Sequence, residues 1–426
     1  MRKILINDGV NQAKLVRTSQ YSQIDEERVR SIVDDVKKSG DKAIKNYTMK
    51  FDNVNIESLK VTEEEYKYAY TKVTKAQINS LKIMKKRLEK TDLQLIRRLK
   101  NIRTIFDGLK IERKLVPIRD VGCYIPGGKA RYPSTLVMCA VPARIAGVKR
   151  VVVTSPPLRD GTIDPLTLVA ADICNVNEVY KIGGAQAIAA LAYGSETVKK
   201  VNKIVGPGGV IVNIAKLIVS GSVSIDMVAG PTELLIYADS LADPKIIVAD
   251  LVSQSEHSID TLCGIVTTSK NMVDKIENEI SGLLSDISLP RIDILKQNLI
   301  KNIFVALCKD ELTSIEFINE FAPEHLEIIS RNARKICKMI DSAGVILLGD
   351  YSPSSGSDYL FGNNHVLPTL EFGKSRASLS VLDFTKIVNI ITATKKGLAV
   401  VEPYIKEIAL SEGLINHYNA VERRFR

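Results

Sequence analysis

The sequence predicts an α/β fold in which parallel sheets are flanked by helices. From Val116 onward, short β-branched runs alternate with Gly-rich turns and Ala-rich helical segments, a pattern typical of parallel strands joined by helices. A chain of 426 residues also exceeds the usual size of one hydrophobic core. We therefore expect two main domains.

The first hundred residues predict helices. Residues 24 to about 110 are rich in charge and carry apolar residues at helical spacing, with a break at Gly40. Residues 1–20 lack this pattern, and we interpret them as a short arm. No side chain of this region suggests chemistry by its type or its neighbours.

Three Gly-rich turns each follow an apolar run that we expect to be a strand. They lie in VGCYIPGGKA (121–130), VYKIGG (179–184) and KIVGPGG (203–209), and the helix AQAIAALAYG (185–194) follows the second. Backbone amides at such turns can hold a pyrophosphate. None of the turns matches G-x-G-x-x-G with an acidic residue at the usual distance, so tight turns explain the glycines equally well.

Composition restricts the class of protein. The hydrophobic fraction of 45% and the charged fraction of 25% are ordinary for a globular protein, and no apolar run is long enough for a membrane span. The formal charge of +10 is scattered, without the basic stripe and interleaved aromatics that nucleic-acid binding favours. The start of the chain has no secretory h-region. We expect a cytoplasmic protein with reduced, mostly buried cysteines: Cys123, Cys139, Cys174, Cys263, Cys308 and Cys337.

The four histidines are the first candidates for chemistry. They are His257, His325, His365 and His417, and each has polar or Gly-rich neighbours. Histidine is the commonest metal ligand and acid/base residue, although a single histidine is more often structural. The second polar residue near each one is what favours function.

Two of these pairs have clear alternatives. Gln254 and His257 are three apart, so a helix would place both on one face toward a single ion, but a Gln carbonyl is an unusual zinc ligand and an exposed polar face is the alternative. Glu324 and His325 are adjacent after a proline. They could divide acid/base work, or Glu324 could simply favour a helix N-terminus.

The remaining candidates lie toward the C-terminus. Asp358 and His365 share the segment SDYLFGNNHVLPT, whose composition predicts a loop that binds rather than packs. Glu412 and His417 are five apart on an expected helix. They could supply a carboxylate and a ligand, or could be exposed.

Taken together, these segments resemble the histidinol dehydrogenase family. The matching text runs in the family's order from about residue 30 to the C-terminus: VGCYIPGG, GGAQAIAALAYG, SIDMVAGPTELLIYAD, ADLVSQSEHS, APEHLEI, SDYLFGNNHVLPT and EGLINH. The number of separate matches makes the resemblance specific. It implies the NAD-dependent oxidation of L-histidinol through L-histidinal to L-histidine, the last steps of histidine biosynthesis.

The resemblance also implies roles for individual residues. It implies one zinc ion per subunit, held by Gln254, His257, Asp358 and His417, and the acid/base residues Glu324 and His325. A set of nitrogen and oxygen ligands suits a site left open to a substrate with nitrogen donors. The implied substrate contacts are Thr232, Gln254, His257, His325, Asp358, His365, Glu412 and His417. The implied NAD contacts are Tyr124, Gln186 and Gly209.

The mechanism that the resemblance implies has two oxidation steps. Zinc orients the amino alcohol through its imidazole and amino nitrogens, which favours near-attack geometry. His325 removes the alcohol proton while a hydride passes to NAD. Glu324 then activates a water that adds to the bound aldehyde, and a second NAD takes the second hydride.

The chain departs from the family pattern at two positions. The usual GPGN is GPGG here, so Gly209 replaces an Asn side chain and removes a possible hydrogen bond to NAD. The usual GPSE is GPTE, so Thr232 replaces Ser and keeps the hydroxyl. The ligand and acid/base positions show no departure.

The resemblance further implies two Rossmann-like domains and a homodimer. One domain would comprise 21–121 and 233–378, and an NAD-binding domain, 122–232, would be inserted in it. The segments 1–20 and 379–426 would lie at the dimer interface. The C-terminal segment would then place Glu412 and His417 in the other subunit's site.

Three alternatives stay open at this point. The first is a dehydrogenase of the same family that oxidises a different amino or hydroxy alcohol. The second is a basic nucleic-acid-binding protein, which a salt-dependent binding shift would support. The third is a relative that lost NAD binding through Gly209.

Overall fold

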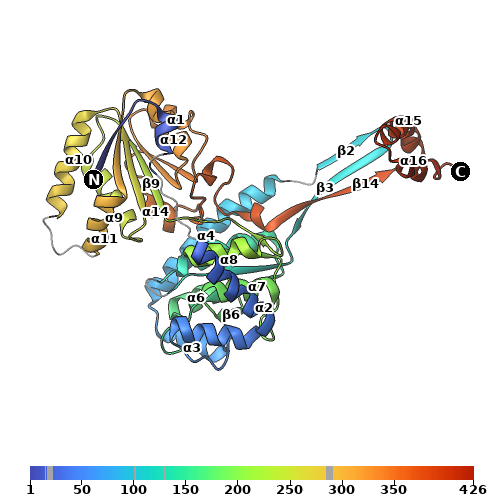
Figure 1. Ribbon diagram of the computed structural model, residues 1–426, viewed down its shortest axis with the longest axis horizontal. Coiled ribbons are helices and arrows are strands. Elements are labelled where there is room, and N and C mark those ends of the chain that lie inside the picture. Colours follow the sequence, from blue (N-terminus) through green and yellow to red (C-terminus); the bar gives the residue numbers. More distant parts are fainter. Residues whose placement is uncertain (15, 17–22, 100–101, 128–130, 285–290) are drawn as a thin grey trace.

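The computed structural model describes residues 1–14, 16, 23–99, 102–127, 131–284 and 291–426, which form two α/β units and a projecting arm (Figure 1). Each unit has one parallel sheet with helices on both faces, which confirms the predicted fold class. No helix in these ranges is long and apolar enough to cross a membrane.

The first unit is built on a parallel sheet of six strands in the order β1-β11-β10-β9-β12-β13. The strands are β1 (Arg2–Ile6), β9 (Glu233–Ala238), β10 (Leu262–Thr267), β11 (Ile303–Cys308), β12 (His325–Ile329) and β13 (Val345–Leu348). One face packs on α1 (Gly9–Ala13), α12 (Glu311–Phe321) and α13 (Ala333–Cys337). The other packs on α9 (Pro244–Ser255), α10 (Lys270–Leu284) and α11 (Ile292–Lys301). Burial on both faces explains why these strands are almost continuously apolar.

The second unit has a parallel sheet of five strands in the order β6-β5-β4-β7-β8. The strands are β4 (Asp120–Tyr124), β5 (Arg150–Ser155), β6 (Glu178–Lys181), β7 (Lys203–Val205) and β8 (Ser224–Ile225). One face is covered by α3 (Glu63–Thr71), α4 (Lys75–Arg98), α5 (Pro133–Ala146) and α6 (Pro165–Ile173). The other is covered by α2 (Gln23–Asp52), α7 (Gly184–Tyr193) and α8 (Val210–Val219).

The strand order of the second sheet changes direction at β4. The chain passes from β4 through α5 to β5 on one side, and from β6 through α7 to β7 on the other. Ligands of open α/β sheets bind in the crevice outside the carboxyl ends of the strands at such a point. Two of the predicted Gly-rich turns, those after β4 and β7, begin there.

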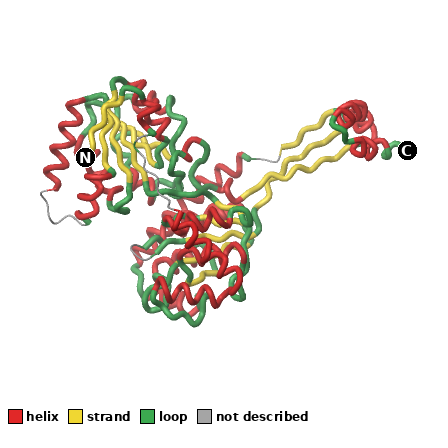
Figure 2. Tube along the Cα trace, in the orientation of Figure 1, coloured by secondary structure: helices red, strands yellow, loops and turns green. Residues whose placement is uncertain are grey.

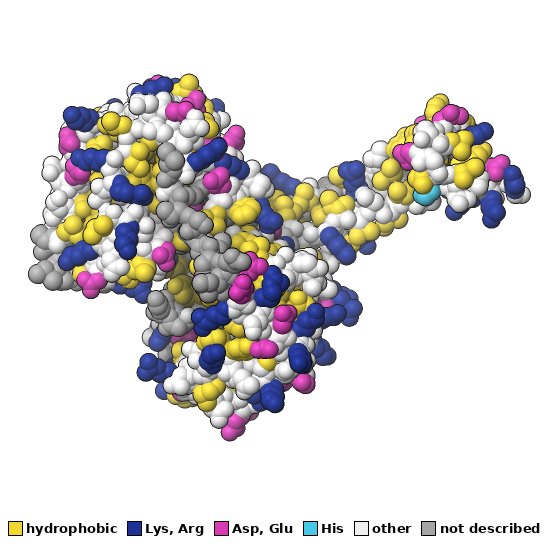
Figure 3. All heavy atoms as spheres, viewed as in Figure 1, with side chains coloured by type: hydrophobic (Ala, Val, Ile, Leu, Met, Phe, Trp, Pro, Cys, Tyr) yellow, Lys and Arg dark blue, Asp and Glu magenta, His cyan; other side chains and the backbone are white. Residues whose placement is uncertain are grey.

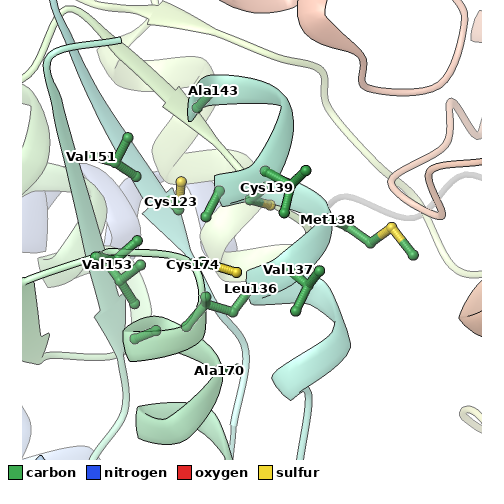
Figure 4. Packing of buried hydrophobic residues seen from close by; sticks show 14 of the residues in the cluster. Cys123, Leu136, Val137, Met138, Cys139, Ala143, Val151, Val153, Ala170 and Cys174 are labelled. Carbon is green, nitrogen blue, oxygen red and sulfur yellow. The ribbon is translucent and has the colours of Figure 1, made fainter. Parts of the chain in front are cut away.

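The core of the second unit contains three of the cysteines. Figure 4 shows Cys123, Cys139 and Cys174 among the apolar side chains of β4, β5, α5 and α6. All six cysteines are free, and all but Cys337 are buried, as predicted. Burial raises the pKa of the Cys174 thiol to about 12, so this thiol stays protonated and unreactive at neutral pH.

The predicted grouping of 21–121 with 233–378 is wrong. The helices α2, α3 and α4 pack on the second unit, against α7 and α8, α6, and α5 respectively. The apolar stripe of α2 fits the Ala-rich surface of α7, and its kink lies at Gly40 as expected. An apolar stripe predicts that a helix is packed, but not which sheet it covers.

The interpretation of residues 1–20 as an arm is also wrong where the structure describes them. β1 is the edge strand of the six-stranded sheet and pairs in parallel with β11, with Arg2 beside Phe304. The helix α1 then packs against α12. Residues 15 and 17–20 lie outside the described ranges.

The arm is a three-stranded antiparallel sheet that ends in two helices. β3 (Leu109–Pro117) lies between β2 (Ile102–Phe106) and β14 (Thr385–Ala393), and α15 (Lys395–Ser411) and α16 (Ile415–Glu422) follow at its tip (Figure 2). Large hydrophobic side chains are exposed along it (Figure 3): Ile102, Ile105, Phe106, Ile387, Val388, Ile390, Ile391, Val400, Tyr404, Ile408, Leu410, Leu414 and Ile415. Monomeric proteins rarely expose an apolar surface of this extent.

Candidate active site

The predicted acid/base residues lie together at the amino end of β12. Both Glu324 and His325 are buried, and the backbone of Glu233 on β9 holds both. The Glu233 N–H donates to Glu324 Oε2 over 2.9 Å, and the Glu233 carbonyl oxygen lies 3.2 Å from His325 Nδ1. The neighbouring strand therefore fixes the orientation of both side chains.

The electrostatic environment raises the pKa values of both groups. Burial raises the pKa of Glu324 to about 8, while the neighbouring imidazole opposes this shift. Burial lowers the pKa of His325, but the charge of Glu324 and a hydrogen bond with Asp358 outweigh burial and raise the pKa to about 9. Strongly shifted pKa values on two adjacent groups are typical of acid/base residues in active sites.

Asp358 connects the acid/base pair to the predicted ligands. It lies on the short helix α14 (Ser354–Tyr359), with its Oδ1 3.0 Å from His325 Nε2. Gln254 Nε2, near the end of α9, donates to Asp358 Oδ2 over 3.5 Å. His257 follows one turn later, where desolvation lowers the pKa of its ring against the charge of Asp358. Its neutral form is the one that binds metals.

An unpartnered buried oxygen indicates that these residues fit a metal ion. Gln254 is almost completely buried, and its Oε1 has no hydrogen-bond partner among the described residues. A buried amide oxygen without a partner is costly unless a ligand satisfies it. Within the described ranges, no cluster of three His, Cys, Asp or Glu side chains has metal-binding geometry. Of the four predicted zinc ligands, only His257 and Asp358 are such residues near this point, because Gln254 is an amide and His417 lies on the arm.

The site lies where the two α/β units meet. His365 Nδ1 is 2.7 Å from the Asp358 carbonyl oxygen, and its Nε2 is 3.1 Å from Thr135 Oγ1 on α5 of the second unit. Desolvation lowers the pKa of His365, so its neutral form is favoured. Thr232 directly precedes Glu233 at the start of β9. Both predicted substrate contacts are therefore close in the fold to the acid/base pair or its ligands.

The three predicted cofactor residues lie at or after the carboxyl ends of β4, β6 and β7. Tyr124 ends β4 and accepts a hydrogen bond from the Gly184 N–H over 3.2 Å. Gln186, on α7, is buried, and its Oε1 has no partner among the described residues. Gly209 is the N-cap of α8, and no described heavy atom lies within 4 Å of where its Cβ would be. Gly128, in the turn after β4, lies outside the described residues.

Glu412 and His417 are not near this site in the single chain. Glu412 follows α15 and His417 is part of α16, at the tip of the arm (Figure 1). Both are exposed. The structure thus brings together all the other predicted metal, acid/base and substrate residues, and leaves these two on a projecting segment.

Three buried carboxylates near the site were not predicted. Glu233 begins the apolar strand ELLIYA, and Asp250 and Glu327 interrupt the apolar runs IIVADLV and HLEII. A charge at a position that the period of a strand or helix would bury is unusual. That signal was present in the sequence, although it cannot say what each carboxylate contacts.

Comparisons with known proteins show similarity to histidinol dehydrogenases. A family model described as histidinol dehydrogenase matches residues 15–425. Histidinol dehydrogenase of Clostridium acetobutylicum is 44% identical over 401 residues, covering 93% of this chain and 92% of that protein. The Methanocaldococcus jannaschii enzyme is 40% identical, with 93% and 92% covered. The crystal structure of histidinol dehydrogenase from Elizabethkingia anophelis superposes with a TM-score of 0.94 at 34% identity, covering 100% and 98% of the two chains.

Proposed function

The chain belongs to the histidinol dehydrogenase family, and from that premise we propose that it oxidises L-histidinol to L-histidine with NAD and one zinc ion per subunit. The observation that carries this proposal is the arrangement of Glu324, His325 and Asp358 beside the unpartnered Oε1 of Gln254. This arrangement places a buried acid/base pair next to oxygen and nitrogen atoms that can bind a metal.

The chain's own residues supply the proton chemistry. His325 takes the alcohol proton in the first oxidation. Its buried ring is oriented by the Glu233 carbonyl oxygen at Nδ1 and by Asp358 at Nε2, and Nε2 would be freed to accept the proton when Asp358 binds the metal. Glu324, 3.7 Å from the same ring, activates the water that adds to the aldehyde. Zinc held by Gln254, His257, Asp358 and His417 would orient the substrate's nitrogen atoms and polarise its oxygen.

The crevice at β4 and β7 is the proposed NAD site. The glycine turn before α8 supports this placement, because the N–H groups of a helix N-terminus attract a pyrophosphate. The unpartnered Gln186 Oε1 supports it as an acceptor for a donor group of the cofactor. The family's Asn at position 209 is absent here. The space around Gly209 is open, so this position has room for the side chain that the family carries there.

A direct assay tests the proposed reaction. Purified protein with equimolar zinc should form two NADH per L-histidinol, and removal of the metal with a chelator should abolish NADH formation until zinc is restored. Other amino and hydroxy alcohols serve as controls, because the imidazole of histidinol is what His365 and the metal would recognise. NADH formed from another alcohol, and none from histidinol, would rule out the proposed substrate.

We further propose that two chains form a homodimer with shared active sites. The apolar surface of the arm needs a partner, and the arm carries Glu412 and His417 away from the other ligands. A second copy is the partner that explains both observations, because it would receive His417 beside Asp358 and cover the exposed side chains.

Complementation between two inactive variants tests the shared site. Asp358→Ala and His417→Ala should each be inactive alone, whereas their co-expression should restore about a quarter of wild-type activity, since half of the dimers would be mixed and one of their two sites intact. Asp358→Ala with His257→Ala is the matched control and should restore nothing, because both residues belong to the same half of the site. Recovery in neither combination would contradict a site shared between subunits.

A further inference from the structure

Beneath the candidate site, a second set of polar groups lies on the same three elements. Asp250 and Glu327 are both buried, and their carboxyl groups share a hydrogen bond. The Ser354 N–H donates to Glu327 Oε1 over 2.7 Å. We call these three groups, Asp250, Glu327 and the Ser354 N–H, the lower layer.

Each member of the lower layer lies one structural repeat from a residue of the site. Asp250 is one helical turn before Gln254 on α9, and Ser354 is one turn before Asp358 on α14. Glu327 is two residues after His325 on β12, so both side chains face α9. The contact of Asp358 with His325 is thus matched one layer below by the contact of Ser354 with Glu327, while Asp250 contacts Glu327.

The surroundings of the lower layer are apolar. Glu327 lies beside Ile236 on β9 and Leu347 on β13, and Ile329 on the same face packs into the cluster under α9. Burial, together with the charge of Asp250, raises the pKa of Glu327 to about 8, so it keeps the proton that a bond between two carboxyl groups needs. Polar groups in such an environment have few partners besides each other.

We propose that Asp250 and Glu327 are positioning residues that fix how α9, β12 and α14 are aligned along their axes. They thereby set the spacing of Gln254, His325 and Asp358. The inference deepens the proposed metal site and rests on it. Groups behind metal ligands typically change metal affinity by about 10- to 100-fold when they are removed.

The test compares three variants with one control. Glu327→Met removes both hydrogen bonds, while Glu327→Gln keeps them, because its amide donates to Asp250 and accepts from the Ser354 N–H. The double variant Asp250→Leu/Glu327→Met replaces both carboxyl groups by apolar side chains, so that neither is left buried without the other. Asp92→Leu is the control. Asp92 is a buried carboxylate on α4 of the second unit, and it accepts a hydrogen bond from the Val381 N–H over 2.9 Å.

Zinc affinity of the full-length protein, measured by competition with a chromophoric chelator, is the first readout. Glu327→Met and the double variant should bind zinc about 10- to 100-fold more weakly, whereas Glu327→Gln and Asp92→Leu should bind it like the wild type. A folded double variant with wild-type zinc affinity would overturn the proposal. The double variant keeps this test valid if Glu327→Met alone does not fold.

Crystal structures of the metal-free wild type and the double variant provide a readout that needs no zinc. The contacts from Asp358 to His325 and Gln254 should lengthen or break in the variant, and should persist in Asp92→Leu. Unchanged contacts in the double variant would overturn the positioning role. Failure of the wild type to bind zinc would instead count against the proposed metal site, so the two failures are distinguishable.

Discussion

Replacing His325 by Asn is expected to lower turnover by about 10²- to 10⁴-fold in both oxidation steps, the range typical of a general acid/base residue. The buried ring of His325 has its Nδ1 3.7 Å from Glu324 Oε2 and its Nε2 3.0 Å from Asp358 Oδ1. Asn is close in shape and can keep one of these contacts, but it cannot take a proton. The loss should therefore lie in kcat rather than in folding.

Glu324→Gln is expected to separate the two steps. Its amide oxygen can still accept from the Glu233 N–H, so the geometry is retained. The variant cannot activate water, and the oxidation of histidinal should slow far more than that of histidinol. Single-turnover NADH formation from each substrate measures the two steps. Equal losses in both steps for both variants would contradict the division of work between Glu324 and His325.

Much of the fold could be predicted because its strands and turns are local features. The buried strands of both sheets, the helix that follows Gly183 and Gly184, and the kink at Gly40 each depend on a few neighbouring residues. The arm could not be predicted, since β3 pairs with β14 across more than 260 residues and both strands mix charged and apolar side chains. The predicted packing position of α2 was wrong for the same reason, because the surface on which this helix packs is formed by a distant part of the chain.

The site shows the same division between local and distant information. Glu324 and His325 are adjacent in sequence, but Asp358 reaches them only because β12, β13 and α14 bring the chain back. The spacing of these residues in the sequence was therefore only a weak indication of a site, and the resemblance to the family supplied the full set of site residues. The carboxylates Asp250 and Glu327 were visible as charges in apolar runs, but their mutual contact depends on the packing of α9 on the sheet.

A buried ion pair supports the glycine turn of the proposed NAD site. Lys216 on α8 is fully buried, and its Nζ pairs with Asp226 and donates to the Gly206 carbonyl oxygen over 3.0 Å. Asp226 Oδ2 accepts from the Gly206 N–H over 2.7 Å. Gly206 has a φ of +114°, and a Cβ there would lie 2.2 Å from the Tyr124 carbonyl oxygen. The pair thus holds both backbone groups of a residue that only glycine can be.

Lys216→Met is expected to destabilise the protein by about 3–5 kcal/mol, because it leaves the buried carboxylate of Asp226 without its cation. The double variant Lys216→Met/Asp226→Asn should recover most of this loss, since the amide oxygen can still accept from the Gly206 N–H and no charge remains buried. Urea unfolding measures the stability of both variants. Lys181→Met is the control, because Lys181 Nζ lies 3.0 Å from Glu65 Oε1 in a less buried pair, and its loss should cost about 1 kcal/mol. Equal losses for Lys216→Met and Lys181→Met would contradict this account.

The double variant also separates stability from function in the turn. Its Gly206 carbonyl oxygen no longer has the Lys216 donor, so the turn before α8 should be less well fixed even when the fold is stable. NAD affinity, measured by calorimetry, should therefore stay below that of the wild type. Full recovery of both quantities would mean that the ion pair serves the core alone. Recovery of stability without recovery of NAD affinity would show that its contact with Gly206 shapes the cofactor site.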